Sequence, residues 1–263
     1  MTNTNTGAEK VRWDLGLMYS GLDDPQIDAD VTVLVEMAKK FNVLHKGKLS
    51  STLGKAISDR SEIDMLESKV MTYLYLLQSI NVAEPTVKAK TAEIDKVLCR
   101  EFGENLTFFQ IELVALDDAT LARLYDDPIV AKHRPWIEHV RVFKPHFLTE
   151  PVESALTKRA PFGASSWGDF FDELEADLEV EFNGEKKTLT EALHILNESK
   201  DAGERAELLK VISTGLKGPF AKYAAQTFYM VVGSKAVEIR ERVYKHPMEL
   251  QNKSNRIPDE VVD

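Results

Sequence analysis

Three histidines and a glutamate in the middle of the chain are the residues best suited to bind a metal. In the zinc motif H-E-x-x-H, the two histidines lie one helical turn apart on one face, and the glutamate is the general base. Here His133 and His139 are six residues apart, which places them about 240° apart around a helix because each residue turns it by ~100°. Pro145 then interrupts the chain before His146, and the glutamate is Glu138. We therefore expect surface or capping histidines and predict no metal ligand, with a new metal site as the alternative.

Two further side-chain types are possible nucleophiles, a pair of serines and a single cysteine. Residues 163–168 are Gly-Ala-Ser-Ser-Trp-Gly, which approaches the nucleophile motif G-x-S-x-G. Trp167 occupies the place of the second glycine, and no strand pattern precedes the turn, so we expect Ser165 or Ser166 to cap a helix. Cys99 lies in the middle of a helical pattern beside an apolar residue, and we interpret it as a small buried or half-buried side chain.

Charged residues offer two more candidates, for calcium and for a substrate carboxylate. The acidic run lacks the D-x-[DN]-x-[DN]-G order of an EF-hand, so we interpret it as a solvated face. Arg205, Arg240 and Arg242 are able to hold a carboxylate, but structural ion pairs are our preferred interpretation in so acidic a chain. Neither glycine-rich phosphate-binding motif occurs. We predict no catalytic residue, and the substrate-binding residues stay unassigned. The acidic run consists of Asp169, Asp172, Glu173, Glu175, Asp177, Glu179 and Glu181.

Composition limits the function classes that are open to the chain. Its 263 residues carry a formal net charge of −10, which argues against a nucleic-acid partner because phosphate binding needs a cationic face. No apolar run approaches the ~18 residues that a membrane span requires. The single cysteine excludes an intramolecular disulfide and fits a reducing compartment. We therefore expect a cytoplasmic protein, with a disordered lead over residues 1–10.

Apolar periodicity predicts a mainly α fold. Helical spacing extends over residues 28–44, 51–82 and 86–116. Because a short turn joins the second and third of these segments, we expect them to pack antiparallel. We assign residues 11–116 to a helical hairpin subdomain.

The second expected subdomain, residues 117–263, is helical with one small β-hairpin. Asp117 and Thr149 are predicted N-caps, and Pro135 marks either a helix start or a kink. Apolar and acidic residues alternate in the strand pattern before Asn183-Gly184, a strong hairpin signal, so we place the hairpin near residues 178–189. Further helices follow it. The last residues, Pro258 onward, have the pattern of a helix start, which predicts a chain truncated before another domain.

A series of short features, in order along the chain, resembles the amino-terminal part of oligoendopeptidase F. No single feature is diagnostic, but their order and spacing together are specific, and the similarity extends from Trp13 to Val262. The features are Trp13-Asp14-Leu15 with Tyr19; Phe108-Phe109 before Glu112-Leu113; Lys144-Pro145-His146-Phe147-Leu148-Thr149 with Glu153; Ser166-Trp167 before Phe170-Phe171; Leu189-Thr190-Glu191-Ala192-Leu193; Asp201 with Glu204-Arg205; Arg240 and Arg242 with Tyr244; and Asn255-Arg256-Ile257-Pro258.

The resemblance implies a function for a longer protein rather than for this chain alone. The family comprises cytosolic zinc metallopeptidases, related to thimet oligopeptidase, that cut short peptides inside a deep channel. Its H-E-x-x-H helix, additional glutamate ligand and transition-state tyrosine and histidine groups have no counterpart here. The resemblance therefore implies a lid or channel-wall portion, with zinc in the full-length enzyme, short peptides as substrates and no activity in this chain alone. Self-association through apolar surface exposed by truncation is a further expectation.

The alternative hypothesis is a free-standing helical module that binds a protein partner without catalysis. It shares the predicted mainly α fold, the hairpin and the lack of catalytic residues. The two hypotheses differ in whether an H-E-x-x-H helix follows in the same reading frame.

Overall fold

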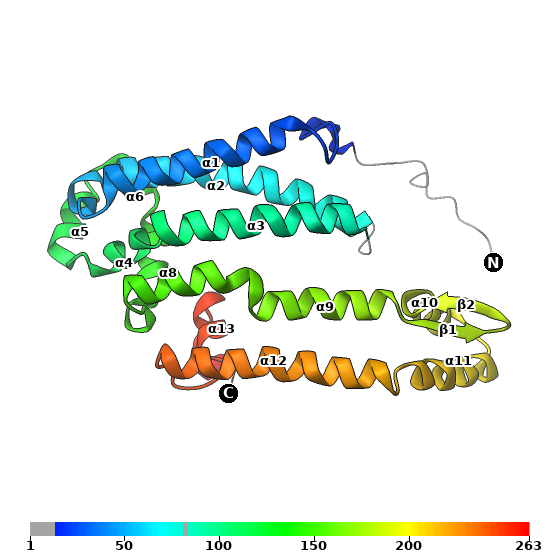
Figure 1. Cartoon of the computed structure of the whole chain (residues 1–263). Coiled ribbons are helices and arrows are strands. Elements are labelled where there is room, and N and C mark those ends of the chain that lie inside the picture. The colour runs from blue at the N-terminus through cyan, green and yellow to red at the C-terminus, as the bar shows by residue number, and fades with distance from the viewer. Residues whose placement is uncertain (1–13, 81–83, 263) are drawn as a thin grey trace.

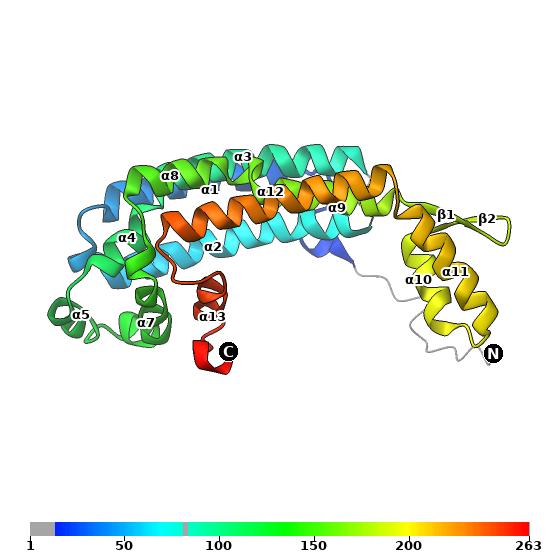
Figure 2. The same ribbon diagram turned by 90° about the horizontal axis from the view of Figure 1, so that it is seen from below.

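The computed structural model describes residues 14–80 and 84–262. The expected disordered lead, Trp13 and the middle of the turn after residue 80 lie outside these ranges. Long helices lie side by side in layers (Figure 1), and shorter helices project from both ends, which gives the molecule an arched outline in Figure 2. The predicted mainly α fold is confirmed. The β structure within the described ranges is one two-stranded hairpin.

Helices α1 (Pro25–His45), α2 (Leu49–Ile80) and α3 (Pro85–Asn105) form the first layer. A proline at the first position sets the starting φ of α1 and of α3 without costing a hydrogen bond. The carboxylates of Asp24 and Glu84 accept hydrogen bonds from the first turns. The apolar stripes predicted for these segments face one another. The core includes fully buried side chains such as Leu34, Phe41 and Leu74.

The third predicted helix, 86–116, is two helices in the structure, α3 and α4 (Phe108–Ala115). Leu106, Phe108 and Phe109 are all buried, yet successive residues of a straight helix point ~100° apart. The break at residues 106–107 lets all three side chains reach the core. The Thr107 hydroxyl donates to the Gly103 carbonyl oxygen at 3.0 Å, a contact that bends helices. The helical spacing of apolar residues over 86–116 does not reveal this break.

Four short helices continue the chain to α8. Asp117 and Asp127 cap α5 and α6 with their side chains, whereas the predicted cap Thr149 precedes α8 without a side-chain hydrogen bond. Pro135 lies in the first turn of α7, so it marks a helix start. These helices are α5 (Asp118–Leu124), α6 (Pro128–Lys132), α7 (Arg134–Val142) and α8 (Glu150–Arg159).

A second, smaller core surrounds the predicted hairpin. Strands β1 (Glu179–Phe182) and β2 (Glu185–Thr188) pair antiparallel, and both Asn183 and Gly184 have positive φ, as the Asn-Gly turn requires. A capping box of Thr188 and Glu191 opens α10. Buried residues of β1 pack on α10 (Leu189–Glu198) and α11 (Ala202–Gly215), remote from the first core.

Helices α9 (Ala164–Ala176) and α12 (Pro219–Glu241) lie along each other and join the two cores. α13 (Glu249–Ser254) follows near the end of the chain. None of the helices in the two described ranges is long and apolar enough to cross a membrane. The first core extends from Tyr19 to Val140 and therefore crosses residue 116; the subdomain boundary assigned there stays a prediction.

Candidate functional site

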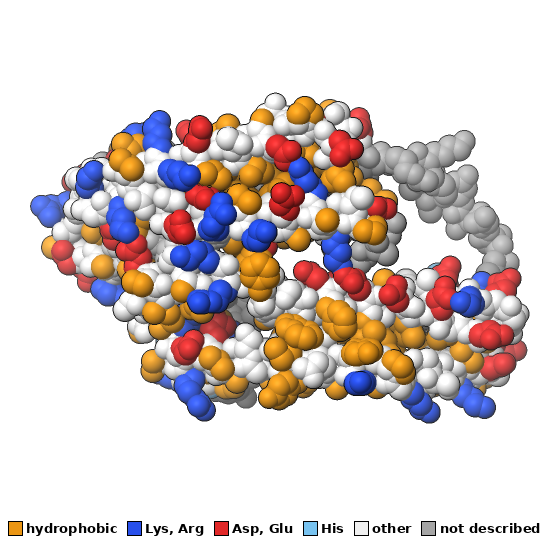
Figure 3. All heavy atoms as spheres, in the orientation of Figure 1, with side chains coloured by type: hydrophobic (Ala, Val, Ile, Leu, Met, Phe, Trp, Pro, Cys, Tyr) orange, Lys and Arg blue, Asp and Glu red, His pale blue; other side chains and the backbone are white. Residues whose placement is uncertain are grey.

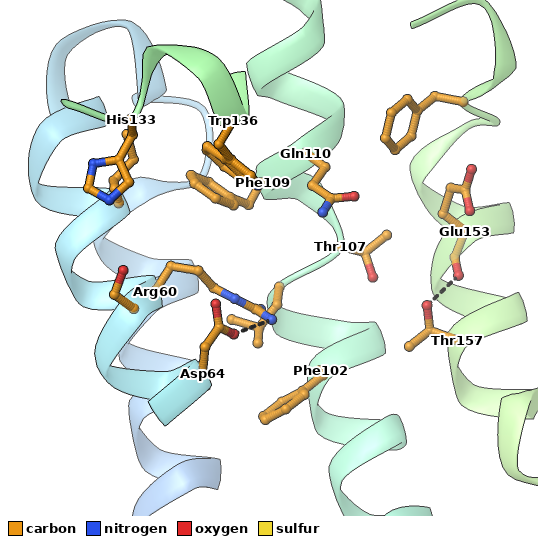
Figure 4. A pocket seen from close by; sticks show the side chains of 14 residues that line it. Arg60, Asp64, Phe102, Thr107, Phe109, Gln110, His133, Trp136, Glu153 and Thr157 are labelled. Atoms are coloured by element: carbon orange, nitrogen blue, oxygen red, sulfur yellow. Dashed lines mark hydrogen bonds and ion pairs between the residues drawn. The ribbon is translucent and has the colours of Figure 1, made fainter. Parts of the chain in front are cut away.

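A cavity of about 510 Å³ lies where α2, α3, α4, α7 and α8 meet, next to the short helical turn Lys144–His146. Its volume falls in the range of small-ligand sites. Figure 4 shows its side chains converging from these helices. The residues that line it are Ile57, Arg60, Ser61, Asp64, Phe102, Leu106, Thr107, Phe109, Gln110, His133, Trp136, Phe147, Glu153 and Thr157.

One wall of this cavity is aromatic. The Phe109 and Trp136 rings are stacked with their centroids 6.0 Å apart and their planes 19° from parallel. Phe109 belongs to the first core, and half-buried Trp136 and Phe147 pack against that core. Because the core fixes these rings from behind, the apolar wall is preformed.

A charged pair closes one side of the cavity. Arg60 and Asp64 are one turn apart on α2, and Arg60 Nη2 lies 2.8 Å from Asp64 Oδ1, as the dashed line in Figure 4 marks. The Arg60 guanidinium also lies over the Phe102 ring, 5.8 Å from its centroid, at cation–π distance. The pairing and the ring contact hold the guanidinium at the cavity edge.

On the other side, buried Glu153 of α8 is paired with Arg242, the residue that follows α12. Arg242 Nη1 and Nη2 donate to the two carboxylate oxygens at 2.6 and 3.0 Å, and the Leu148 amide donates to the same carboxylate at 2.9 Å. Burial alone would raise the pKa of Glu153, but these hydrogen bonds outweigh it, so the pKa lies below its ordinary value. The hydrogen bond to Glu153 likewise raises the pKa of Arg242. Both groups are charged at neutral pH.

A second cavity of about 360 Å³ adjoins the first and shares Gln110, Phe147 and Glu153 with it. It reaches buried His146, whose ring stacks on Tyr244 with centroids 4.0 Å apart. The residues that line the two cavities extend from α2 to the end of α12. We call the two cavities together the α2–α12 groove.

The proton positions on His146 follow from its partners. Nδ1 lies 2.8 Å from the Arg242 carbonyl oxygen, which only accepts, so Nδ1 carries a proton. Nε2 lies 2.8 Å from Lys253 Nζ and 3.6 Å from Glu249 Oε1. The ring therefore joins the Lys144–His146 turn, the end of α12 and α13. Its role in this arrangement is structural.

The three histidines of the sequence cluster are not brought together around a shared point. His133 Nδ1 donates to the Ile129 carbonyl oxygen at 2.8 Å, and the His139 ring lies edge-on against Phe143. Among residues 14–80 and 84–262, no group of three or more His, Cys, Asp or Glu side chains is arranged to hold a metal ion. The donor set in these ranges does not fit zinc.

The possible nucleophiles occupy structural positions. Burial, together with the charge of Asp95 and a hydrogen bond to it, raises the pKa of the Cys99 thiol to about 12, so the thiol is protonated and a poor nucleophile. Ser165 and Ser166 lie in the first turn of α9, whose N-cap is Gly163, so the prediction that one of them caps the helix is wrong. Their hydroxyls donate to the carbonyl oxygens of Ala160 and Gly163 at 3.1 and 2.7 Å. They therefore stabilise the turn between α8 and α9.

The other charged candidate residues are either exposed or paired with groups of the protein itself. In the acidic run, Glu179 and Glu181 of β1 are exposed and alternate with buried apolar residues. Arg242 makes the ion pair with Glu153 described above, as the sequence predicted for the arginines. Arg205 instead donates to the Ser199 carbonyl oxygen at 3.0 Å, and Arg240 is exposed.

Sequence reasoning missed most of the groove. The spacing of Arg60 and Asp64 is a signal for an ion pair on one helix face, and it could have been found. The residues that face this pair come from four other helices, and the sequence carries no local signal for that meeting. Gln110 is an example of such a residue. It is polar and exposed on α4, and nothing near it in the sequence indicates that it lines a cavity.

The comparisons with known proteins agree with the fold. Residues 112–179 match the family model described as Oligopeptidase F. The structure resembles the crystal structure of oligoendopeptidase-F from Enterococcus faecium, with a TM-score of 0.77 and 22% sequence identity, over 90% of this chain and 48% of that one. The chain therefore spans about half of that solved chain. The search of curated proteins gave no match.

Both findings support the resemblance to the amino-terminal part of oligoendopeptidase F. The family model covers the stretch from α4 through α9 to the start of β1, where several of the resembling sequence features lie. At 22% identity, the solved structure establishes a common fold.

Proposed function

We propose that this chain is the amino-terminal, non-catalytic wall of a zinc oligopeptidase of the oligoendopeptidase F type, and that it helps to position short peptides in an enclosed channel. The observation that carries the proposal is the fold match over 90% of this chain to about half of one such protein. The α2–α12 groove is the surface on this chain that we assign to the peptide. A narrow, enclosed channel admits flexible short chains and excludes folded proteins.

The layer of α9 and α12 is the surface that we assign to the catalytic half. Figure 3 shows hydrophobic side chains gathered over these two helices. On α12, Phe228 and Tyr229 are each 71% exposed, and Tyr223, Val232 and Val237 are exposed as well. These residues point in several directions around the helix, and a helix that is apolar on most sides is normally covered.

Zinc chemistry belongs, in this proposal, to the half of such a peptidase that this chain does not span. The described residues do not offer a zinc donor set, so we assign no metal-dependent step to them. We expect this chain alone to hydrolyse no peptide. We place the whole protein in the cytoplasm, as the resemblance implies.

The proposal is tested by extending the reading frame beyond Asp263 and coexpressing the encoded segment with this chain. We expect an H-E-x-x-H helix in that segment, copurification of the two polypeptides and zinc-dependent cleavage of a short internally quenched peptide. Neither polypeptide alone should cleave it, and a chelator should abolish the cleavage. A reading frame that closes at Asp263, or that encodes no such helix, would refute the peptidase function.

A free-standing helical interaction module is the second candidate function. The exposed apolar side chains of α12 favour it too, because they suit a protein partner as well as a catalytic half. The coexpression experiment separates the two, since the module requires neither the zinc helix nor peptide cleavage. Under either function we expect this chain alone to self-associate through the α9–α12 layer.

A further inference from the structure

The charges at the first cavity of the α2–α12 groove cancel in pairs. Arg60 is paired with Asp64 at 2.8 Å, and Glu153 is paired with Arg242 at 2.6 Å. Arg242 donates to both oxygens of buried Glu153, and Arg60 and Asp64 neutralise each other through one contact. A charged ligand would therefore meet little net charge here, and at Glu153 it would also have to disturb a buried pair. This balance favours an uncharged occupant.

Neutral hydrogen-bonding groups line the cavity beside these paired charges. The Thr107 and Thr157 hydroxyls donate to the carbonyl oxygens of Gly103 and Glu153, both at 3.0 Å, which leaves their oxygens able to accept. Within residues 14–80 and 84–262, the Gln110 side-chain amide makes no hydrogen bond to the protein. Figure 4 shows Gln110 and Thr107 at the cavity between the aromatic rings and α8. An amide with a free donor and a free acceptor matches a peptide bond.

We propose that this cavity binds an uncharged aromatic or large aliphatic side chain of a peptide, with the Gln110 amide hydrogen-bonded to the adjacent peptide bond. The stacked rings of Phe109 and Trp136 supply the apolar contact, since aromatic groups pack favourably in offset or edge-on contact. The inference rests on the proposed function in taking the occupant to be a peptide. It goes further in assigning a side-chain class and the residues that select it.

The neighbouring cavity gives the rest of the peptide a path. Gln110, Phe147 and Glu153 line both cavities, so a peptide whose side chain fills the first continues past these residues toward Tyr244. Arg242 neutralises the charge of Glu153 and donates to both of its carboxylate oxygens, so Glu153 offers little attraction to a free amino terminus. We therefore assign the site to an internal residue of the peptide.

Trp136 provides a direct optical measurement of binding. The chain contains three tryptophans, and the double substitution W13F/W167F leaves Trp136 as the reporter in the cavity wall. Capped peptides acetyl-Gly-X-Gly-amide are titrated into this protein, with X as Phe, Leu, Ala, Asp or Lys. We expect saturable fluorescence changes, with Phe and Leu bound at least about tenfold more tightly than Ala, and with Asp and Lys no tighter than Ala.

Two substitutions test the position of the site. Ser61 is exposed and lines the cavity, so Ser61→Phe should fill its mouth and weaken binding of the Phe peptide at least about tenfold. Ser68→Phe is the matched control, since Ser68 is exposed two turns further along the same face of α2 and does not line the cavity. Gln110→Ala should weaken binding about fivefold through one lost hydrogen bond. Circular dichroism verifies that each variant is folded.

The inference is overturned if no peptide of the series changes the Trp136 signal at millimolar concentration, or if Asp or Lys peptides bind most tightly. Equal weakening by Ser61→Phe and Ser68→Phe would also overturn it. These measurements use this chain alone and need no cleavage, so they fail or succeed independently of the coexpression experiment. Loss of peptide binding with intact cleavage in the coexpressed protein would refute the side-chain site and leave the proposed function standing.

Discussion

Helices α1 and α12 have similar lengths, 21 and 23 residues, but they are packed very differently. α1 buries Ile27, Leu34, Ala38 and Phe41 along one stripe that faces α2 and α3. α12 buries Thr227 and no other described residue, and its main neighbour is α9, which buries none. The first layer therefore has its own core, whereas the α9–α12 layer depends on contacts between partly exposed aromatic rings. An apolar helix is stabilised by its partners and not by its composition.

Aromatic side chains of α9 and α12 contact each other in the second layer, but these contacts do not bury the two helices completely. Phe170 and Tyr223 meet edge-on with centroids 6.2 Å apart, and Phe171 meets Phe220 at 6.1 Å. Each such contact contributes roughly 0.5–1.5 kcal/mol beyond area burial. They hold the two helices together while the outer faces stay exposed. This difference between the layers predicts how each responds to substitution.

The largest contrast is expected between a phenylalanine of each layer. Phe41→Ala removes a side chain that is 1% exposed and should lower the free energy of unfolding by about 3–5 kcal/mol, because it leaves a cavity in the core. Phe228→Ala removes one that is 71% exposed and should change it by less than about 0.5 kcal/mol. Urea denaturation followed by circular dichroism measures both.

Phe228→Ala should have its effect on self-association instead. Light scattering at increasing concentration should show smaller assemblies for this variant than for the unchanged protein. A protein that is monomeric at high concentration before any substitution, or a Phe228→Ala cost as large as that of Phe41→Ala, would mean that α12 is covered after all.

A somewhat smaller effect is expected where α8 is joined to the end of α12 through a buried ion pair. Arg242→Ala leaves the Glu153 carboxylate buried, with 11% of its side chain exposed, and without its bidentate partner. We expect a loss of about 3 kcal/mol in the free energy of unfolding. Arg240→Ala is the control, two residues away and exposed, and should cost less than about 0.5 kcal/mol. Equal losses in the free energy of unfolding for Arg242→Ala and Arg240→Ala would show that positive charge near the end of α12 stabilises the fold, rather than the Glu153–Arg242 pair.

The same pair predicts a direction for the pH dependence. The folded-state pKa of Glu153 is lowered from 4.5, because hydrogen bonds from Arg242 and Leu148 outweigh burial. A lowered pKa contributes stability that is present above about pH 4.5 and is lost as the pH falls through the folded-state value. Glu153→Gln cannot titrate, so the stability difference between the unchanged protein and this variant should shrink below pH 4.5. Denaturation curves from pH 7 to pH 3 measure it, and the subtraction cancels the other carboxyl groups. A difference that grows on acidification would contradict the assigned direction.

Local sequence signals specify many elements of this fold. Asp24-Pro25, Asn183-Gly184 and the Thr188–Glu191 capping box each specify their structure within a few residues of sequence. The α3–α4 break was missed because its cause is tertiary. Leu106, Phe108 and Phe109 are all buried in one core. The helical spacing of apolar residues does not indicate that the chain has to bend to bury all three.

The groove was less predictable than the fold because its residues meet only in three dimensions. Arg242 was a candidate in the sequence, but its partner Glu153 lies 89 residues away. The histidines were excluded as a zinc site by their spacing, and the structure gives each of them a different partner. Trp136 and Gln110 form one wall of the groove because α4 and α7 pack together. Such a meeting is a property of helix packing and leaves no motif.

The smallest contrast is expected between two glycines, Gly184 in the hairpin and Gly168 in α9. Neither has an atom within 4 Å of the position where a Cβ would be added, so the outcome depends on backbone conformation alone. Gly184 has a φ of +78°, which alanine adopts at a cost, so Gly184→Ala should destabilise the hairpin by about 1 kcal/mol. Gly168 lies in the helix interior, where alanine should stabilise by roughly 0.5–1 kcal/mol. Amide hydrogen exchange at β1 and in α9 reports each region separately. A Gly168→Ala loss would show that the outer face of α9 is already in contact with another surface.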